Sequence, residues 1–515
     1  MKIFCAVMLL GFVAHEAIAQ CPDGAAPPCA TKALRPVSAP AHSVAVLYFE
    51  NLSRDTSDAY LAEGLTDEIT ARLGQVGRLV VTSRTAVRRL KNAAARTTPE
   101  LGRDLNVTYL VNGTVRRSLG NLRVGVELLR ASDGVQVWSN QFDRTQTDLL
   151  AIQEQIAVAV ANAIVGRLLP SEKPRLEARP TRSALAYDYY LRASRALIEL
   201  KPPSFERAVS GFETALRLDP KFVAAQGRLA FAYGLIVNWD WTLPGVAPGE
   251  LVSRGLQNAS RALETDSLSS DAWVGRGMLL FFRSPPDYEG SINSLRRGVA
   301  LDSLNATAHY AYGLVLRRLG DFATSEAEYR RAVELDPDQR LALGDLGLIA
   351  YTLRRFPEAR DWYERSVAAD STAWHHLIFL SRIRLALRDT AGARRDAESA
   401  VRHAPPAAAH LALAVLSQVE AALGDTAAAR ARLEPVLAEV PGNGPLTVRD
   451  GYEFALGLLG IGRRDEAIGM LSRVQPRGAW LWSYLILPWF DPLRADPRFV
   501  RIVEEARPAA APHMR

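Results

Sequence analysis

Cysteine and histidine are scarce in this chain, which has three cysteines and eight histidines among 515 residues. We find no Ser/His/Asp or Cys/His arrangement and no HExxH motif. His375 and His376 are adjacent, so on a helix they point in different directions and are poorly placed to bind one metal ion. The sequence therefore predicts no catalytic residues, no metal and no cofactor.

Lysine is also rare, because only six of the 62 basic residues are lysine. The formal net charge of +6 comes from arginines that are interspersed with acidic residues along the chain. The one basic run, formed by Arg84, Arg88, Arg89 and Lys91, lacks the aromatic residues that interleave with basic ones in nucleic-acid sites. We predict no nucleic-acid partner.

The amino terminus has an apolar run that is too short to span a bilayer as a stable helix. Lys2, the run and the Ala17-Ile18-Ala19 cleavage site predict a signal peptide at 1–19. A lipoprotein signal is the alternative, although Gln20 stands where a small residue is expected before Cys21. After cleavage, Cys21 and Cys29 could form a disulfide in an oxidising compartment. We expect a periplasmic or secreted protein, and peripheral association with the envelope fits the same reading.

A Pro/Ala-rich tether at 20–41 leads to a predicted α/β domain at 42–169. Its alternating pattern predicts strands and helices in the order β-α-β-α-β-β-β-α. The predicted strands cover 43–49, 79–81, 107–117, 122–130 and 135–142, and the predicted helices cover 59–73, 85–91 and 148–169, with another beginning at Thr98. Two weak sites stand out: the loop with Asn51, Ser53 and Asp55, and the helical carboxylates Glu63 and Asp67. We interpret the carboxylates as a solvated helix face.

Four stretches of this domain resemble the amino-terminal domain shared by TolB and FlgO proteins. They are 44–53 (VAVLYFENLS), 61–69 (LAEGLTDEI), 109–116 (YLVNGTVR) and 137–144 (VWSNQFDR). In that family the domain often follows an adenylate cyclase, a kinase or a winged-helix module, and here an export signal stands in their place.

From Asn305 to Pro405 the chain repeats itself at a period of 34 residues, as Pro337, Ser371 and Pro405 show, and related units begin at 187. Gly313 and Gly347 recur at one place in the first half of their units, where two helices must touch. The pattern resembles the tetratricopeptide repeat, a helix-turn-helix unit that stacks into a right-handed superhelix. We predict a linker at 170–186, about eight repeats at 187–480, and a cap and tail at 481–515.

In tetratricopeptide arrays the first helix of each unit lines a concave groove. The resemblance therefore implies a partner-binding surface made of Met278, Phe281, Tyr310, Leu314, Arg317, Leu348, Tyr351, His375 and Arg382. We expect a non-enzymatic scaffold that binds a protein or peptide, with Tyr310, Tyr351 and Arg317 as anchors. The alternative is a sensory component whose α/β domain binds a ligand and whose array relays the occupancy.

Overall fold

The computed structural model describes residues 39–509, with gaps at 56–57, 83–86, 88–89, 91–95, 119–120, 146–148, 174–175, 177–178, 338, 441 and 443. The predicted signal peptide, the predicted Cys21–Cys29 disulfide, most of the tether and the basic run at 84–91, apart from Val87 and Leu90, lie outside the described residues. Among the described residues, no helix is both long enough and apolar enough to cross a bilayer.

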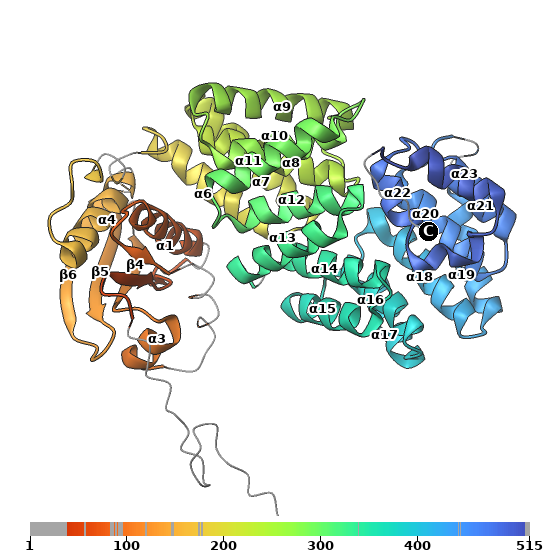
Figure 1. The fold of residues 1–515 in the computed structure, drawn as a ribbon, viewed down its shortest axis with the longest axis horizontal. Coiled ribbons are helices and arrows are strands. Elements are labelled where there is room, and N and C mark those ends of the chain that lie inside the picture. Colours follow the sequence, from red (N-terminus) through yellow and green to blue (C-terminus); the bar gives the residue numbers. More distant parts are fainter. Residues whose placement is uncertain are drawn as a thin grey trace, which may run out of the picture.

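The amino-terminal domain is a small α/β unit built on one mixed sheet (Figure 1). Its strands are β1 (Ser43–Val46), β2 (Glu50–Asn51), β3 (Val80–Val81), β4 (Tyr109–Ser118), β5 (Asn121–Arg130) and β6 (Gln136–Thr145). The order is β3-β1-β4-β5-β6, and β2 also pairs with β4. β1 is parallel to β3 and β4, whereas β4, β5 and β6 run antiparallel.

Helices cover both faces of this sheet. Successive side chains of β1 point to opposite faces, so they pack against different helices. Val44 and Val46 pack with α1 (Ala59–Gly74) and α4 (Leu149–Val165), while Ala45 packs in a second cluster with α3 (Thr98–Leu105). The strand predicted at 43–49 stops at Val46. Phe49 turns inward there and lies over Gly113, where an added Cβ would come within 2.4 Å of its ring.

The rest of the described chain is a long solenoid of helices, as the repeat predicts (Figure 1). Eight helix pairs follow one another. They are α6 (Ala184–Ile198) with α7 (Pro202–Leu218), α8 (Val223–Asn238) with α9 (Pro248–Thr265), α10 (Ser270–Phe282) with α11 (Tyr288–Leu301), α12 (Ala306–Leu319) with α13 (Phe322–Leu335), α14 (Arg340–Thr352) with α15 (Phe356–Ala369), α16 (Trp374–Ala386) with α17 (Thr390–His403), α18 (Ala409–Ala422) with α19 (Thr426–Ala438), and α20 (Val448–Gly460) with α21 (Arg464–Ser472). A short turn η3 (Pro406–Ala408) precedes α18, and α22 (Ala479–Leu485), η4 (Pro488–Leu493) and α23 (Pro497–Ala506) end the described chain.

The small residues of the repeat bring the two helices of a pair together. An added Cβ on Gly313 would lie 2.8 Å from the Tyr329 ring, and one on Gly347 would lie 2.5 Å from the Tyr363 ring. Both tyrosines are buried, and Ser325 Oγ donates a 2.7 Å hydrogen bond to the Gly313 carbonyl. The glycines therefore have the packing role that the period predicts.

The α/β domain and the first helix pair share one continuous core, although the sequence predicts a linker at 170–186 between them. Leu176, inside the predicted linker, is buried, and its carbonyl accepts a hydrogen bond from the Arg72 guanidinium. Tyr60 Oη donates to Asp188 Oδ1 at 2.5 Å, and Gln153 Nε2 donates to Tyr187 Oη at 3.1 Å. Buried polar contacts thus join α1 and α4 to α6, and the predicted domain boundaries stay a prediction.

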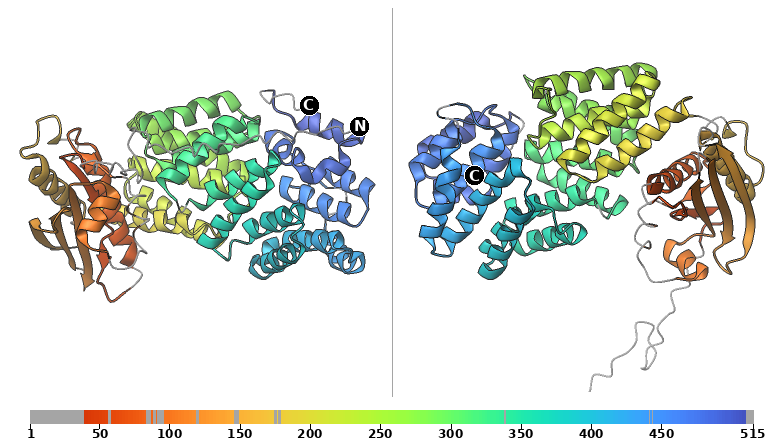
Figure 2. Two further views of the ribbon diagram at one scale, coloured as in Figure 1. Left: turned by 60° about the horizontal axis from the view of Figure 1, so that its bottom comes forward. Right: turned by 180° about the vertical axis from the view of Figure 1, so that it is seen from behind.

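The solenoid winds so tightly that distant pairs touch. Arg340, at the start of α14, donates a 2.8 Å hydrogen bond to the carbonyl of Ile198 at the end of α6. Figures 1 and 2 show the carboxy-terminal helices at the end of the molecule opposite the α/β domain, and there α22 lies beside α12. As a result α12 is buried on all sides from Ala308 to Leu319.

Candidate functional site

The nine predicted groove residues lie on the inner helices of the solenoid, but they do not form an open surface. Met278, Phe281, Tyr310, Leu314, Arg317, Leu348, Tyr351 and Arg382 are each at most 4% exposed, and His375 is half-buried. A partner cannot reach the eight buried side chains in this conformation. Their role as partner contacts stays a prediction, and it requires a change of structure.

The groove is filled by residues 479–493, which comprise α22 and η4 and which we call the closing segment. The Trp480 ring packs edge-on against Phe282 at 5.8 Å, and Arg318 Cζ lies 5.1 Å from the centre of the Trp480 ring and 5.9 Å from that of Tyr484. The Trp489 ring lies 5.3 Å from Tyr351.

Trp489 also stacks on Phe379 at 5.5 Å and lies 4.5 Å from the Arg382 guanidinium. Arginine stacked on an aromatic ring is an attractive electrostatic contact. Rings and guanidinium groups therefore hold the closing segment in the groove.

The charged residues of the groove are paired inside the protein. Arg382 forms a bidentate ion pair with Glu453, and its Nε donates to Gln418 at 2.7 Å. Arg317 lies 3.3 Å from Asp345, which also accepts a 3.0 Å hydrogen bond from Tyr329 Oη. The predicted anchor Arg317 is therefore engaged by Asp345.

Arg318 is the exception, because no carboxylate among the described residues pairs with it. Its Nη2 donates to Asn238 Oδ1 at 2.7 Å, while Nε and Nη1 have no hydrogen-bond partner in the described structure. Burial lowers its pKa to about 10, which still leaves the guanidinium charged at neutral pH. Sequence reasoning missed Arg318 because it follows the groove position Arg317 by one residue.

His375 and His376 are adjacent rings 4.1 Å apart on α16. Burial lowers the pKa of both imidazoles, to about 3 for His376, whose Nδ1 lies 2.6 Å from Ser366 Oγ. Across the described part of the chain, no group of three or more His, Cys, Asp or Glu side chains could hold a metal ion.

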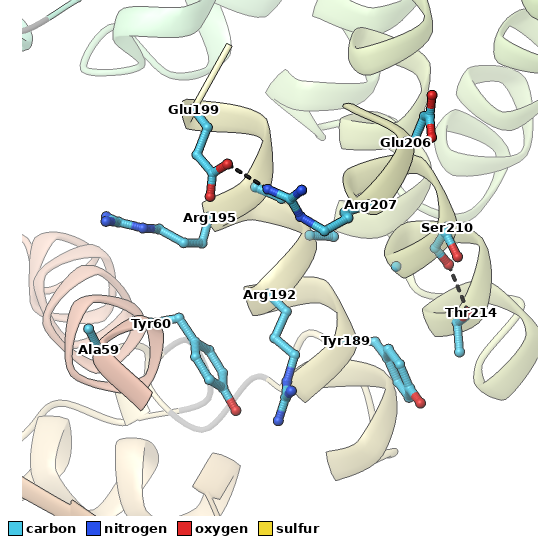
Figure 3. A pocket seen from close by; sticks show the side chains of 13 residues that line it. Ala59, Tyr60, Tyr189, Arg192, Arg195, Glu199, Glu206, Arg207, Ser210 and Thr214 are labelled. Carbon is cyan, nitrogen blue, oxygen red and sulfur yellow. Dashed lines mark hydrogen bonds and ion pairs between the residues drawn. The ribbon is translucent and has the colours of Figure 1, made fainter. Parts of the chain in front are cut away.

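A cleft of about 760 Å³ lies between the two domains, and we call it the interdomain cleft (Figure 3). Side chains from α1, α6 and α7 line it. The residues are Ala59, Tyr60, Tyr189, Arg192, Ala193, Arg195, Ala196, Glu199, Glu206, Arg207, Ser210, Gly211 and Thr214. No sequence motif marks these residues as a site, because the cleft exists only where α1 meets α6.

Each arginine of the cleft faces a carboxylate. Arg192 Nε donates to Asp188 at 2.9 Å while its guanidinium lies 4.9 Å from the centre of the Tyr60 ring. Arg195 pairs with Glu63 at 2.6 Å, which gives that predicted carboxylate a structural role, and Arg207 pairs with Glu199 at 2.6 Å. The positive charge of each arginine in the cleft is therefore balanced by a carboxylate.

Burial and the hydrogen bond to Asp188 raise the pKa of Tyr60, so its hydroxyl stays protonated and acts as a donor.

The other weak site predicted from the sequence is the loop after β1, where the polar groups of Asn51 and Ser53 are engaged in hydrogen bonds inside the protein. Ser53 N donates to Asn51 Oδ1 at 3.0 Å, and Arg117 N donates to Ser53 Oγ at 2.9 Å.

The model of the tetratricopeptide repeat family matches residues 287–340 and 315–373. These residues are tetratricopeptide repeats. The matched stretch contains α12 to α15, the pairs in which Gly313 and Gly347 meet Tyr329 and Tyr363. This part of the chain thus has the repeats and the fold of that family.

The chain is 29% identical over 229 residues to "Putative adenylate cyclase 3" of Rhizobium meliloti (strain 1021), which is 44% of this chain and 38% of that protein. It is 24% identical over 118 residues to anaphase-promoting complex subunit 3 of Schizosaccharomyces pombe, covering 23% of this chain and 17% of that protein. The chain thus spans well under half the length of both relatives. Yeast Tom70 resembles it at 15% identity and a TM-score of 0.38, covering 70% of this chain and 82% of Tom70, and that score is too low to support an inference about function.

Proposed function

We propose that this protein is a non-enzymatic scaffold of the bacterial cell envelope that binds a protein or peptide in the groove of its tetratricopeptide array. One observation carries the proposal: the groove already holds a polypeptide segment. The closing segment is seated against α12, α14 and α16 by aromatic and arginine contacts, so the inner surface has the chemistry to hold a peptide. The TolB/FlgO-like resemblance of the amino-terminal domain belongs to the same proposal, as the part that docks the array.

Site-specific photo-crosslinking in cells tests the groove directly. Arg354 lies at the groove rim, where it pairs with Asp491 of the closing segment at 2.7 Å, and its side chain is 59% exposed. Arg360 on α15 is a matched control, because it is a 42% exposed arginine on an outer helix. We expect a crosslinker at 354, but not at 360, to yield a defined higher-mass adduct. Equal adducts at both positions, or none at 354, would refute binding in the groove.

The envelope location rests on the predicted signal peptide, so it needs its own experiment. Intact-mass measurement of protein from the envelope fraction should show a chain that begins at Gln20, with a mass two hydrogens short for a Cys21–Cys29 disulfide. A diacylated amino-terminal Cys21 would instead make the protein a lipoprotein anchored to a membrane surface.

The absence of enzyme activity is part of the proposal, because one relative is named as an adenylate cyclase. We expect the purified chain to form no cyclic AMP from ATP with Mg²⁺ or Mn²⁺. Turnover that survives further purification would contradict the scaffold.

A second candidate is a sensor, and the interdomain cleft favours it. The cleft is shared by α1 of the α/β domain and α6 of the array, so a ligand bound there would touch both units. A small molecule that stabilises the full chain thermally, and fails to do so after Arg192→Ala, would favour this reading.

A further inference from the structure

The closing segment has a groove face, formed by Trp480 and Trp489, and a second face that packs mainly on its carboxy-terminal neighbours. Leu481, Leu485 and Phe490 are fully buried in a cluster that also contains Tyr351 of α14 and Leu380 of α16, and Phe490 stacks there on Phe499 of α23 at 5.6 Å. Trp480 and Trp489 instead reach α10, α12, α14 and α16. The segment thus has neighbours in α20 and α23 besides the groove helices, and these neighbours can keep it attached when a partner replaces its contacts with the inner helices.

Tyr484 lies between the two faces. Its ring stacks on Tyr452 of α20 at 4.4 Å, and the same ring lies 5.9 Å from Arg318 Cζ. Three aromatic side chains, Trp480, Tyr484 and Trp489, thus make most of the described ring and guanidinium contacts with the groove. The fit to Arg318 is incomplete, because two of its donor nitrogens have no hydrogen-bond partner among the described residues.

We propose that the closing segment is a releasable internal ligand, and that a partner binds by replacing it with a helical segment carrying aromatic residues at positions i and i+4 and an acidic residue beside them. This inference rests on the proposed scaffold function and adds the chemistry of the partner. The two aromatic positions follow from Trp480 and Tyr484, which both lie against Arg318. The acidic residue follows from the unpaired donors of Arg318, which a carboxylate would satisfy and the closing segment does not.

The strength of the contacts means that a partner must replace them and not only break them. Buried aromatic side chains contribute large apolar areas, and Tyr484 and Trp489 are 8% and 9% exposed. The exposed ion pair between Arg354 and Asp491 adds little. A partner that supplies the same ring contacts and one further charged hydrogen bond would compete with the closing segment.

The test uses the full chain and a fluorescent peptide with the sequence of residues 478–493. Trp480→Ala combined with Trp489→Ala removes the groove face of the closing segment, and we expect this variant to bind the peptide at least about tenfold more tightly than the wild type. Trp362→Ala is the matched control, because that tryptophan also stacks on arginines, Arg330 and Arg365, but lies on outer helix α15. The control should bind no more peptide than the wild type.

Two altered peptides test the chemistry. A peptide with both tryptophans replaced by alanine should not bind the double variant. A peptide carrying Ser483→Glu, one residue before Tyr484, should bind several-fold more tightly than the unaltered peptide. Weaker binding by the Ser483→Glu peptide would overturn the acidic requirement, and equal binding of the unaltered peptide to wild type and double variant would overturn release.

Arg354→Ala keeps the experiment decisive if the double variant does not fold. This surface change removes only the rim ion pair with Asp491, and we expect about twofold to threefold more peptide binding than in the wild type. If neither Arg354→Ala nor a folded double variant binds peptide better than the wild type, the proposal is wrong. If the double variant binds the peptide but no partner is crosslinked at position 354 in cells, the closing segment is a releasable internal ligand and the proposed scaffold function is wrong.

Discussion

Removing Glu453 should destabilise the inner part of the solenoid strongly. The side chains of Arg382 and Glu453 are 1% and 0% exposed, so their bidentate ion pair is shielded from water. Glu453→Leu would leave the buried guanidinium with only Gln418 and the Trp489 ring as partners. Loss of one member of a buried pair costs about 3–5 kcal/mol, because the remaining charge is uncompensated.

The double substitution Arg382→Met with Glu453→Leu separates the cost of an unpaired charge from loss of packing. Replacing both members of a buried pair by apolar side chains is often nearly neutral, so we expect the double variant to recover most of the stability lost by Glu453→Leu. Glu250→Ala is the control for an exposed pair, since Glu250 and Arg254 are 46% and 47% exposed, and we expect a loss of about 0.5 kcal/mol or less.

Urea unfolding followed by circular dichroism gives the free energies, and hydrogen exchange of the α20 amides shows whether the loss is local. The exchange measurement matters because a long repeat array need not unfold in one step. A loss below about 1 kcal/mol for Glu453→Leu would refute a water-free ion pair in the groove. The same conclusion would follow if the double variant lost as much stability as Arg382→Met and Glu453→Leu lose together as single variants.

Three further predictions concern single side chains. Tyr363→Ala should cost about 3–5 kcal/mol in urea unfolding, because the ring is buried against Gly347, and a loss below about 0.5 kcal/mol would show that it is not core. His376, whose pKa is lowered from 6.5 to about 3, should contribute stability above pH 6.5 that is lost as pH falls toward 3, and His376→Asn should flatten this loss in pH-dependent melting. Asp240 should act in the opposite sense, since burial raises its pKa from 3.8 to about 6: stability is lost as pH rises through 6, and Asp240→Asn should melt higher than the wild type at pH 7 but not at pH 3.5.

The sequence predicted the contacts that lie within one repeat or between neighbouring repeats. Gly313 with Tyr329 and Gly347 with Tyr363 are separated by one turn between two helices, so the 34-residue period contains both partners. The fold class, a small α/β domain followed by an all-α solenoid, followed from the same local patterns. Strand ends were less accurate, as at β1, because Phe49 turns inward to meet Gly113 on a strand that comes much later in the chain.

Contacts that depend on the pitch of the whole superhelix were beyond the reach of the sequence. Eight of the nine residues predicted to line the groove are buried, and nothing in a 34-residue unit specifies whether the axis of the superhelix is open. Trp480 reaches Arg318 only because the intervening pairs place α22 beside α12. The contacts at the junction of the two domains could not be predicted for the same reason, because Tyr60 and Asp188 are 128 residues apart in the sequence.

The placement of the closing segment explains why the partner has to compete for the groove. A repeat array exposes apolar surface at its two ends and along its inner helices unless something covers them. Here α1 covers the first pair, α23 packs on α21 and α22, and the closing segment covers the inner helices, so the chain buries each of these surfaces by itself. A partner that binds the groove must then displace the closing segment, whereas a ligand of the interdomain cleft need not. Hydrogen exchange of α12 and α22 on addition of a captured partner distinguishes the two: faster exchange in α22 together with continued protection of α12 is expected for groove binding, and unchanged exchange in both would place the partner elsewhere.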